Sequence, residues 1–159
     1  MDDEPATQAA IRRLRRVANY QFGRGAGAAL LPDDGAITVT HTSSGRVEQC
    51  FDDGERLFTK ATDGRFVLSV AGGRRLVWSR SEPRHYVEVG EESVPFVRDG
   101  KNAFAKFVQS VDPGLRPGDE AVVVHDGAVL GVGRAELPAA GMEDFETGVA
   151  VHVRHGASD

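Results

Sequence analysis

The chain has 159 residues, of which 40% are hydrophobic and 27% are charged. This composition is typical of a soluble globular protein, and the length suits one ordinary domain or two small ones. No run approaches the roughly 18 apolar residues of a transmembrane helix, and the acidic start MDDEPATQ does not resemble a signal peptide. Cys50 is the single cysteine, which excludes an intrachain disulfide and a cysteine-based zinc site. We therefore expect a reducing, cytoplasmic setting.

The net charge of −5 argues against nucleic-acid binding by the chain as a whole. The charge is unevenly distributed, however. Residues 11–80 contain 12 Lys and Arg against 7 Asp and Glu, a net +5, whereas residues 81–159 contain 7 against 14, a net −7. A basic front half is thus joined to an acidic back half. Such acidity, with few lysines, would also suit a cytoplasm of high salt concentration.

The first expected element is a helix that ends near residue 22. Four apolar residues form one stripe at helical spacing: Ile11, Leu14, Ala18 and Phe22. The acids before it and Pro5 suit the start of a helix. Three arginines fall roughly opposite the stripe: Arg12, Arg13 and Arg16. Two interpretations stay open, a solvated basic face or a surface that contacts phosphate, since arginine neutralises the charge of the nucleic-acid backbone.

A glycine-rich stretch and a series of alternating segments follow. The stretch FGRGAGAALL, residues 22–31, lacks the Gly-Lys-Ser/Thr ending of a P-loop and follows no strand, so we expect a turn and a short helix there. Five segments between glycine turns are predicted to form a β-meander: 36–41, 46–51, 55–61, 65–70 and 74–79. The helices and this sheet would close one small α+β unit.

The polar, proline-containing segment SEPRH, residues 81–85, is the predicted domain boundary. It divides the chain into a domain of residues 1–82 and a domain of residues 83–159. In the second domain, the turn Arg98-Asp99-Gly100 is predicted to lead into a helix over residues 101–111. A short helix or turn is predicted at 138–146. Four strands are predicted around these elements: 86–90, 120–126, 128–137 and 148–155. The fold class is therefore α+β, with a small pseudo-barrel covered by a helix.

No residue pattern points to catalysis or metal binding. The five histidines lack the spacing of a ligand motif, no G-x-S-x-G elbow is present, and Cys50 lies within a predicted strand. We therefore expect no catalytic residue, no metal and no cofactor, and we do not expect this chain to be an enzyme by itself.

The second half resembles the PUA domain, which is named for pseudouridine synthases and archaeosine transglycosylases. The resemblance lies in SVPFVRDGKNAFAKFVQSVDPGLRPGDEAVVVHDGAVLGVGRAEL and in GVAVHVRHG. The first half, in RRLRRVANYQFGRGAGAALLP and SSGRVEQCF to GGRRL, resembles the unit that precedes the PUA domain in archaeal tRNA-guanine transglycosylase. Together the two similarities extend over residues 11–155.

The resemblance implies a β pseudo-barrel that binds structured RNA through its first helix, the preceding loop and neighbouring strands. On this chain it indicates five residues: Arg98, Gly100, Lys101, Asn102 and Lys106. Arg116, Arg134 and Arg154 are further RNA-binding candidates, together with the arginines of the first helix. The glycine would let the backbone approach RNA, Lys101 and Asn102 would donate to phosphate or sugar, and two phenylalanines, Phe104 and Phe107, would fix the helix to the barrel.

The same resemblance implies tRNA as the RNA, held at its acceptor stem and 3′ end while a separate barrel exchanges the base. The chain lacks that barrel and the cysteine set of its structural zinc. The hypothesis is thus a non-catalytic tRNA-binding protein, with room for a separately encoded catalytic subunit and no role for a membrane. The alternatives are a protein-interaction subunit that docks a catalytic partner through the acidic PUA half, a small enzyme that lacks a known motif, and an ordinary capped helix with two solvated lysines.

Overall fold

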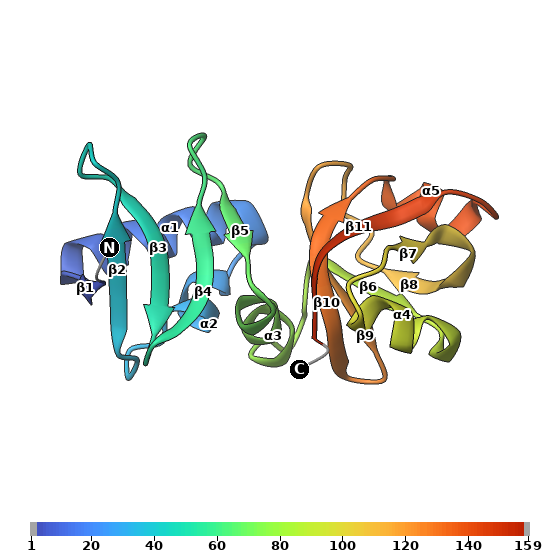
Figure 1. Ribbon diagram of the computed structural model, residues 1–159, viewed down its shortest axis with the longest axis horizontal. Helices are drawn as coiled ribbons and strands as arrows, with labels where there is room; N and C mark the ends of the chain where they lie inside the picture. Colours follow the sequence, from blue (N-terminus) through green and yellow to red (C-terminus); the bar gives the residue numbers. More distant parts are fainter. Residues whose placement is uncertain (1–2, 158–159) are drawn as a thin grey trace. The chain divides into compact units, whose positions relative to one another are not determined.

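The computed structural model describes residues 3–157 and consists of two compact units, Met1–Ser81 (unit 1) and Glu82–Asp159 (unit 2). Unit 1 contains a five-stranded antiparallel sheet in the order β1-β2-β3-β4-β5. The strands are β1 (Glu4–Pro5), β2 (Ile37–His41), β3 (Val47–Asp52), β4 (Glu55–Lys60) and β5 (Phe66–Leu68). The four from β2 to β5 confirm the predicted meander, and Figure 1 shows them side by side.

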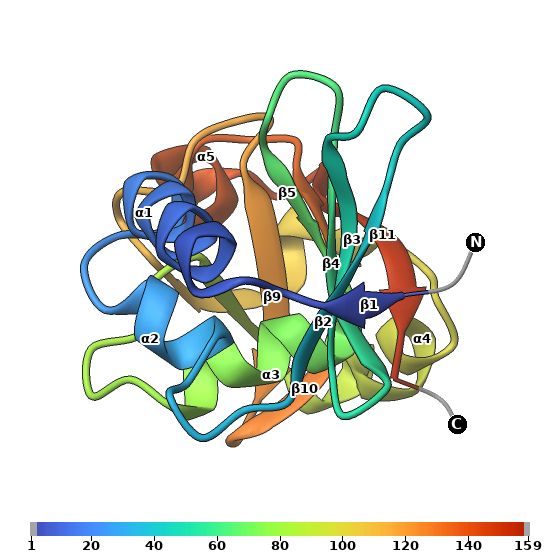
Figure 2. The ribbon, with the colours of Figure 1, turned by 90° about the vertical axis from the view of Figure 1, so that its left-hand side faces the viewer.

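Two helices cover one face of the unit 1 sheet, α1 (Gln8–Phe22) and α2 (Ala26–Leu30) (Figure 2). The helix α1 begins at the N-cap Thr7, whose hydroxyl accepts a hydrogen bond from the Ala10 N–H at 3.1 Å, so Pro5 belongs to β1 and not to a helix start. The side chain of Gln21 bonds both backbone groups of Phe66, at 2.7 and 2.9 Å. These bonds fix the C-terminal end of α1 to β5, so α1 crosses the sheet from β1 to β5.

The prediction of a strand at 74–79 was wrong, because the chain forms the helix α3 (Val70–Trp78) there. The hydroxyl of Ser69 caps this helix by accepting from the Gly72 N–H at 3.0 Å, and it donates to the Leu57 carbonyl at 2.9 Å. A Cβ atom at Gly72 would lie 2.1 Å from the Leu57 oxygen. Gly72 is therefore a close helix–strand contact, and the Gly-Gly pair is not the turn that the sequence suggested.

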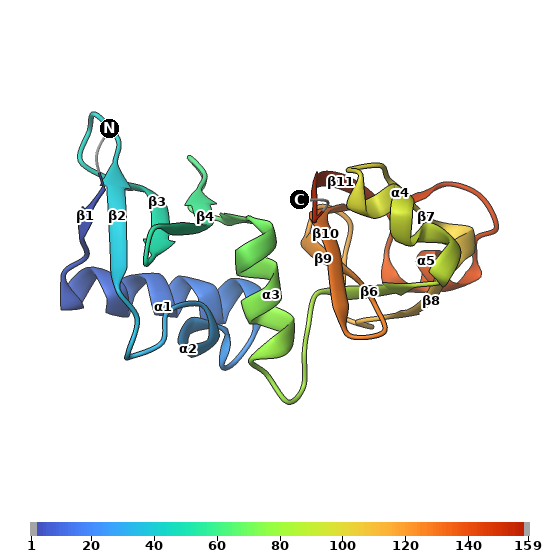
Figure 3. The same cartoon turned by 60° about the horizontal axis from the view of Figure 1, so that its bottom comes forward.

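Unit 2 is a curled six-stranded sheet in the order β7-β11-β10-β9-β6-β8 (Figure 3). The strands are β6 (Tyr86–Val89), β7 (Ala103–Phe104), β8 (Val108–Val111), β9 (Glu120–His125), β10 (Ala128–Ala135) and β11 (Val149–Gly156). All pairs are antiparallel except β6 with β9. Bulges in β10 and β11 bend the sheet, and the core between its layers includes Val123, Leu130 and Met142. This α+β half-barrel agrees with the predicted fold class.

The helix predicted over 101–111 was wrong. The helix of this region lies earlier, as a 3₁₀ turn η1 (Glu91–Ser93) followed by α4 (Val94–Arg98), which packs against β10 and β11. Residues 103–111 form β7, a 3₁₀ turn η2 (Ala105–Phe107) and β8. Burial alternates along this segment, with Ala103 buried and Phe104 45% exposed, which is a strand pattern. Phe104 therefore does not fix a helix to the barrel. A last helix, α5 (Ala139–Asp144), packs against β8 and η2.

Candidate nucleic-acid-binding surfaces

Gly100 lies in the loop that joins α4 to β7, and its conformation ends the helix. Its N–H donates to the Val97 carbonyl at 2.9 Å, and the N–H of Lys101 donates to the Phe96 carbonyl at 2.9 Å, which is the Schellman pattern of a helix C-terminus. The φ angle of Gly100 is 87°, in the left-handed region that favours glycine. A Cβ here would meet nothing within 4 Å, so the backbone of this turn is open to an approaching ligand.

Cations and exposed aromatic rings flank this turn in sequence. We call them the α4–β7 surface: Phe96, Arg98, Lys101, Phe104 and Lys106. Phe96 and Phe104 are 56% and 45% exposed. The Nζ of Lys101 lies 3.8 Å from the exposed Asp99 carboxylate, a pair too long and too exposed to neutralise the lysine in water. The surface therefore offers positive charge and planar apolar area together, which suits an RNA with exposed bases.

Asn102 has a structural role besides the predicted one. Its Oδ1 atom accepts a hydrogen bond from the Val153 N–H of β11 at 3.0 Å, and its side chain is half-buried. The carbonyl oxygen is thus committed to the sheet, and only the amide nitrogen could donate to a ligand.

The three remaining candidates of unit 2 differ in their availability. Arg154 forms a bidentate pair with Glu120, at 2.6 and 3.3 Å, and these side chains are 29% and 10% exposed. A guanidinium held this way is committed to its carboxylate. Arg134 lies 3.5 Å from Glu136 and remains 58% exposed, and Arg116 is exposed in the loop between β8 and β9. Sequence reasoning could not foresee the partner of Arg154, which is 34 residues away.

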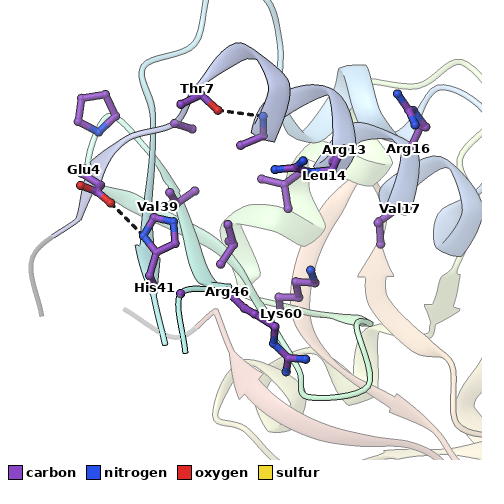
Figure 4. Close-up of a pocket in the computed structure, with 15 residues that line it drawn as sticks. Glu4, Thr7, Arg13, Leu14, Arg16, Val17, Val39, His41, Arg46 and Lys60 are labelled. Carbon is purple, nitrogen blue, oxygen red and sulfur yellow. Dashed lines mark hydrogen bonds and ion pairs between the residues drawn. The ribbon is translucent and has the colours of Figure 1, made fainter. Parts of the chain in front are cut away.

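Two arginines of α1 line a cleft between this helix and the unit 1 sheet, with a volume of about 770 Å³ (Figure 4). Arg13 and Arg16 line it, whereas Arg12 does not. Two further cations line the same cleft, Arg46 at the start of β3 and Lys60 at the end of β4. Sequence reasoning missed both, because the alternation of a strand does not reveal which strand ends meet a helix. We call this set of four cations and the apolar residues beneath it (Leu14, Val17 and Val39) the unit 1 cleft.

Two observations concern metal-binding and nucleophilic side chains among the described residues. Between residues 3 and 157, no three His, Cys, Asp or Glu side chains are grouped to hold a metal ion. Burial raises the pKa of the Cys50 thiol to about 12, and the Asp52 carboxylate acts in the same direction. A thiol that stays protonated at neutral pH is a poor nucleophile. Within the same residues, every helix is too short or too polar to cross a membrane.

Comparison with known proteins assigns a family to each unit. Residues 12–83 match the patch-forming domain C2 of tRNA-guanine transglycosylase, and residues 85–157 match the PUA domain. The chain is a PUA-domain protein that resembles the C-terminal region of archaeal tRNA-guanine transglycosylase. This confirms the resemblance seen in the sequence.

Relatives by sequence are archaeal enzymes much longer than this chain. The tRNA-guanine(15) transglycosylase of Pyrococcus abyssi (strain GE5 / Orsay) is 40% identical over 158 residues, which is 98% of this PUA-domain protein and 26% of the relative. The enzyme of the same name from Methanothermobacter thermautotrophicus is 40% identical over 148 residues, 92% of this chain and 22% of the relative. The chain thus spans about a quarter of the length of these relatives.

Solved structures of similar size share the fold. A hypothetical protein from Pyrococcus horikoshii OT3 superposes with a TM-score of 0.77 at 21% identity, and the match covers 99% of this chain and 96% of that one. A conserved PUA domain protein from Thermoplasma acidophilum gives a TM-score of 0.73 at 22% identity, covering 99% and 95%. At such identities the likeness establishes the fold alone.

Proposed function

We propose that this protein is a non-catalytic RNA-binding protein that grips tRNA at its acceptor stem and 3′ end, in connection with tRNA modification. The PUA match and the similarity to enzymes named tRNA-guanine(15) transglycosylase support RNA binding linked to tRNA modification. We assign this function to a chain of two domains, residues 1–82 and 83–159. The two compact units support this division. A cytoplasmic location is part of the same proposal.

The α4–β7 surface is the observation that carries the proposal. Residues 81–159 have a net charge of −7, so RNA would be repelled by most of unit 2 and must be held locally. The surface supplies cations, an open backbone turn and two exposed rings within eleven residues, 96–106. Few phosphate contacts give a shallow salt dependence, because log K changes by only about 0.9 per neutralised duplex phosphate for each log unit of salt. Hydrogen bonds to 2′-OH groups and stacking would then carry much of the affinity.

We further propose that base exchange is the work of a different polypeptide segment, with which this chain would cooperate. The chain matches about a quarter of each relative, and residues 3–157 contain no group of three His, Cys, Asp or Glu side chains that could hold a metal ion. A separately encoded catalytic subunit would carry out the reaction, while this protein would bind the tRNA.

The experiment that tests the proposal is filter binding of the protein to transcribed tRNA, to the same tRNA without its 3′ end, and to duplex DNA, across a salt series. We expect tRNA to bind most tightly, and 3′ truncation to weaken binding. The double variant Lys101→Glu/Lys106→Glu should lose most of its tRNA affinity. Arg24→Glu is the control for charge reversal at one exposed site, because Arg24 is exposed in the turn after α1 and belongs to neither surface. Equal, weak and salt-sensitive binding to all three nucleic acids would contradict the proposal.

A second candidate function is a protein-interaction subunit, in which the acidic unit 2 docks a catalytic partner. One feature favours it: the end of α5 exposes Glu143, Asp144 and Glu146 around Phe145, whose side chain is 51% exposed. An apolar ring within carboxylates suits a basic protein surface. Under this function, Lys101→Glu/Lys106→Glu would leave RNA affinity unchanged, and only changes at Arg12, Arg13 and Arg16 would lower it.

A further inference from the structure

Four cations line the unit 1 cleft. Arg13 and Arg16 come from one face of α1, Arg46 from the turn before β3 and Lys60 from the end of β4 (Figure 4). Within residues 3–157, none of the ion pairs involves any of the four. Among residues 3–157, the carboxylate that lines the cleft is that of Glu4, which lies 3.0 Å from Nδ1 of His41.

Such a cluster is unfavourable unless an anion occupies it. Like charges repel, and the repulsion is strongest in a concave site, where low-dielectric walls focus the field. The neighbouring Arg15 shows the contrast on the same helix, because its guanidinium is neutralised by Asp33 at 2.9 Å and bonds the Leu31 carbonyl at 2.7 Å. Arg15 stabilises the fold, whereas the four cations of the cleft are left for a ligand.

The base of the cleft is apolar. Leu14 and Val17 from α1 and Val39 from β2 lie beneath the cations, with Leu14 and Val39 buried and Val17 half-buried. Its volume of about 770 Å³ falls in the range of about 300–1,000 Å³ found for sites that enclose a small organic ligand. A site with cations above and apolar side chains beneath suits a ligand that is anionic at one end and flat and apolar at the other, which describes a nucleotide.

We propose that the unit 1 cleft binds a single-stranded nucleotide segment of RNA, with its phosphates on the four cations and a base against the apolar residues. This inference rests on the proposed RNA-binding function and adds a second contact, distinct from the α4–β7 surface. A duplex presents phosphates outside and keeps its bases stacked inside, so it could reach the cations but not the base of the cleft. Three polar side chains that line the cleft are already engaged, Thr7 in capping α1 and Glu4 with His41. We therefore expect the base to be held by apolar contact, with little selection for its identity.

The test uses the 159-residue chain and a fluorescein-labelled RNA oligonucleotide of about six nucleotides, a length within the site sizes of single-strand binders. The same sequence as a blunt duplex is the comparison. In the variant Arg13→Gln/Lys60→Gln we expect the hexamer to bind at least tenfold more weakly. The slope of log K against log salt should shrink by about 1.4, since each phosphate contact with a single strand contributes about 0.7. Arg24→Gln, which removes one exposed cation of unit 1 outside the cleft, should bind the hexamer as the unmodified chain does.

Methyl NMR of the valines adds a readout that surface attraction alone would not change. Binding of the hexamer should shift the methyl resonances of Val17 and Val39, and the duplex should not. Arg13 is exposed and Lys60 is partly exposed, and thermal denaturation of the variant checks that it is folded. Unchanged hexamer affinity in the double variant would overturn the inference. So would unshifted valine methyls, or displacement of the hexamer by an oligoglutamate of equal charge, which would indicate an acidic peptide as the occupant.

The outcomes separate this inference from the proposed function. Lys101→Glu/Lys106→Glu should weaken tRNA binding while the hexamer still shifts Val17 and Val39. If that variant kept its tRNA affinity and the hexamer still bound the cleft, the proposed role of the α4–β7 surface would be refuted and the proposed role of the cleft would be supported. If tRNA affinity fell in Lys101→Glu/Lys106→Glu but Arg13→Gln/Lys60→Gln bound the hexamer normally, the role of the α4–β7 surface would be supported and the role of the cleft would be refuted.

Discussion

Asn102 allows the anchoring of the α4–β7 loop to be separated from its proposed contact with RNA. In Asn102→Ala, the Val153 N–H of β11 loses its acceptor at 3.0 Å, and Val153 is 5% exposed. An unsatisfied donor in such a place costs about 1–3 kcal/mol. In a unit of fewer than 100 residues, each kcal/mol lowers Tm by about 4–8 °C. We therefore expect a Tm for unit 2 that is lower by roughly 4 °C or more, and tRNA binding that weakens because the loop is released.

Asn102→Asp is the matched variant, because it keeps an oxygen for the Val153 N–H and replaces only the amide nitrogen. Stability should stay close to that of the unmodified chain. A carboxylate near a phosphate at about 4 Å costs at least about 1 kcal/mol even in water, so tRNA affinity should fall about fivefold to tenfold. Guanidinium denaturation and filter binding give the two quantities. Normal tRNA affinity in Asn102→Asp would show that this side chain does not face RNA, and an unchanged Tm in Asn102→Ala would refute the anchoring argument.

Two further predictions concern the stability of unit 2. Gly100→Ala should lose about 1–2 kcal/mol, because its φ of 87° disfavours a side chain although space is open; Gly100→Asn should lose less in the same thermal denaturation, and equal losses would contradict this. Asp112 is buried, and burial alone would raise its pKa. Its carboxylate, however, accepts hydrogen bonds from the N–H groups of His85 and Gly114 and lies near the charge of Arg84. Together these lower the pKa of Asp112 below its usual value. A lowered folded-state pKa stabilises the fold above the unfolded value of about 4, and this contribution is lost as pH falls through the folded pKa. Denaturation at pH values between about 5 and 2 should thus show the loss in the unmodified chain and much less of it in Asp112→Asn.

Regular patterns with local causes were predictable from the sequence, and close contacts between distant segments were not. The stripe from Leu14 to Phe22 and the alternating strands of both units follow from burial on one face. The strand at 74–79 was wrong because the Gly72 contact with Leu57 cannot be told from a turn in one sequence. The helix at 101–111 was wrong because two phenylalanines were taken for a buried helical face, although the small residues Ala103 and Ala105 are the buried ones.

The candidate site shows the same division. Arg98, Gly100 and Lys101 were singled out by the PUA resemblance and by a glycine turn beside cations, although the sequence placed the helix after this turn and the structure places it before. Arg46 and Lys60 come together because of strand register. The C-terminal ends of β2 and β4 pair with the beginning of β3, and at that end of the sheet Arg46 and Lys60 line the cleft with α1. Register is set by long-range pairing, and a single sequence carries little trace of it.

The acidity of unit 2 is consistent with RNA binding if it serves selectivity. With a net charge of −7 over residues 81–159, a polyanion that meets unit 2 anywhere but at its few cations is repelled, and like-charge contacts of this kind suppress wrong partners. Salt screens this repulsion over a Debye length of about 8 Å at physiological ionic strength. The hydrogen bonds and stacking proposed for the α4–β7 surface would be much less affected by salt. Raising salt should therefore lower tRNA affinity less than it lowers duplex DNA affinity, so that the ratio of tRNA to duplex DNA affinity rises with salt.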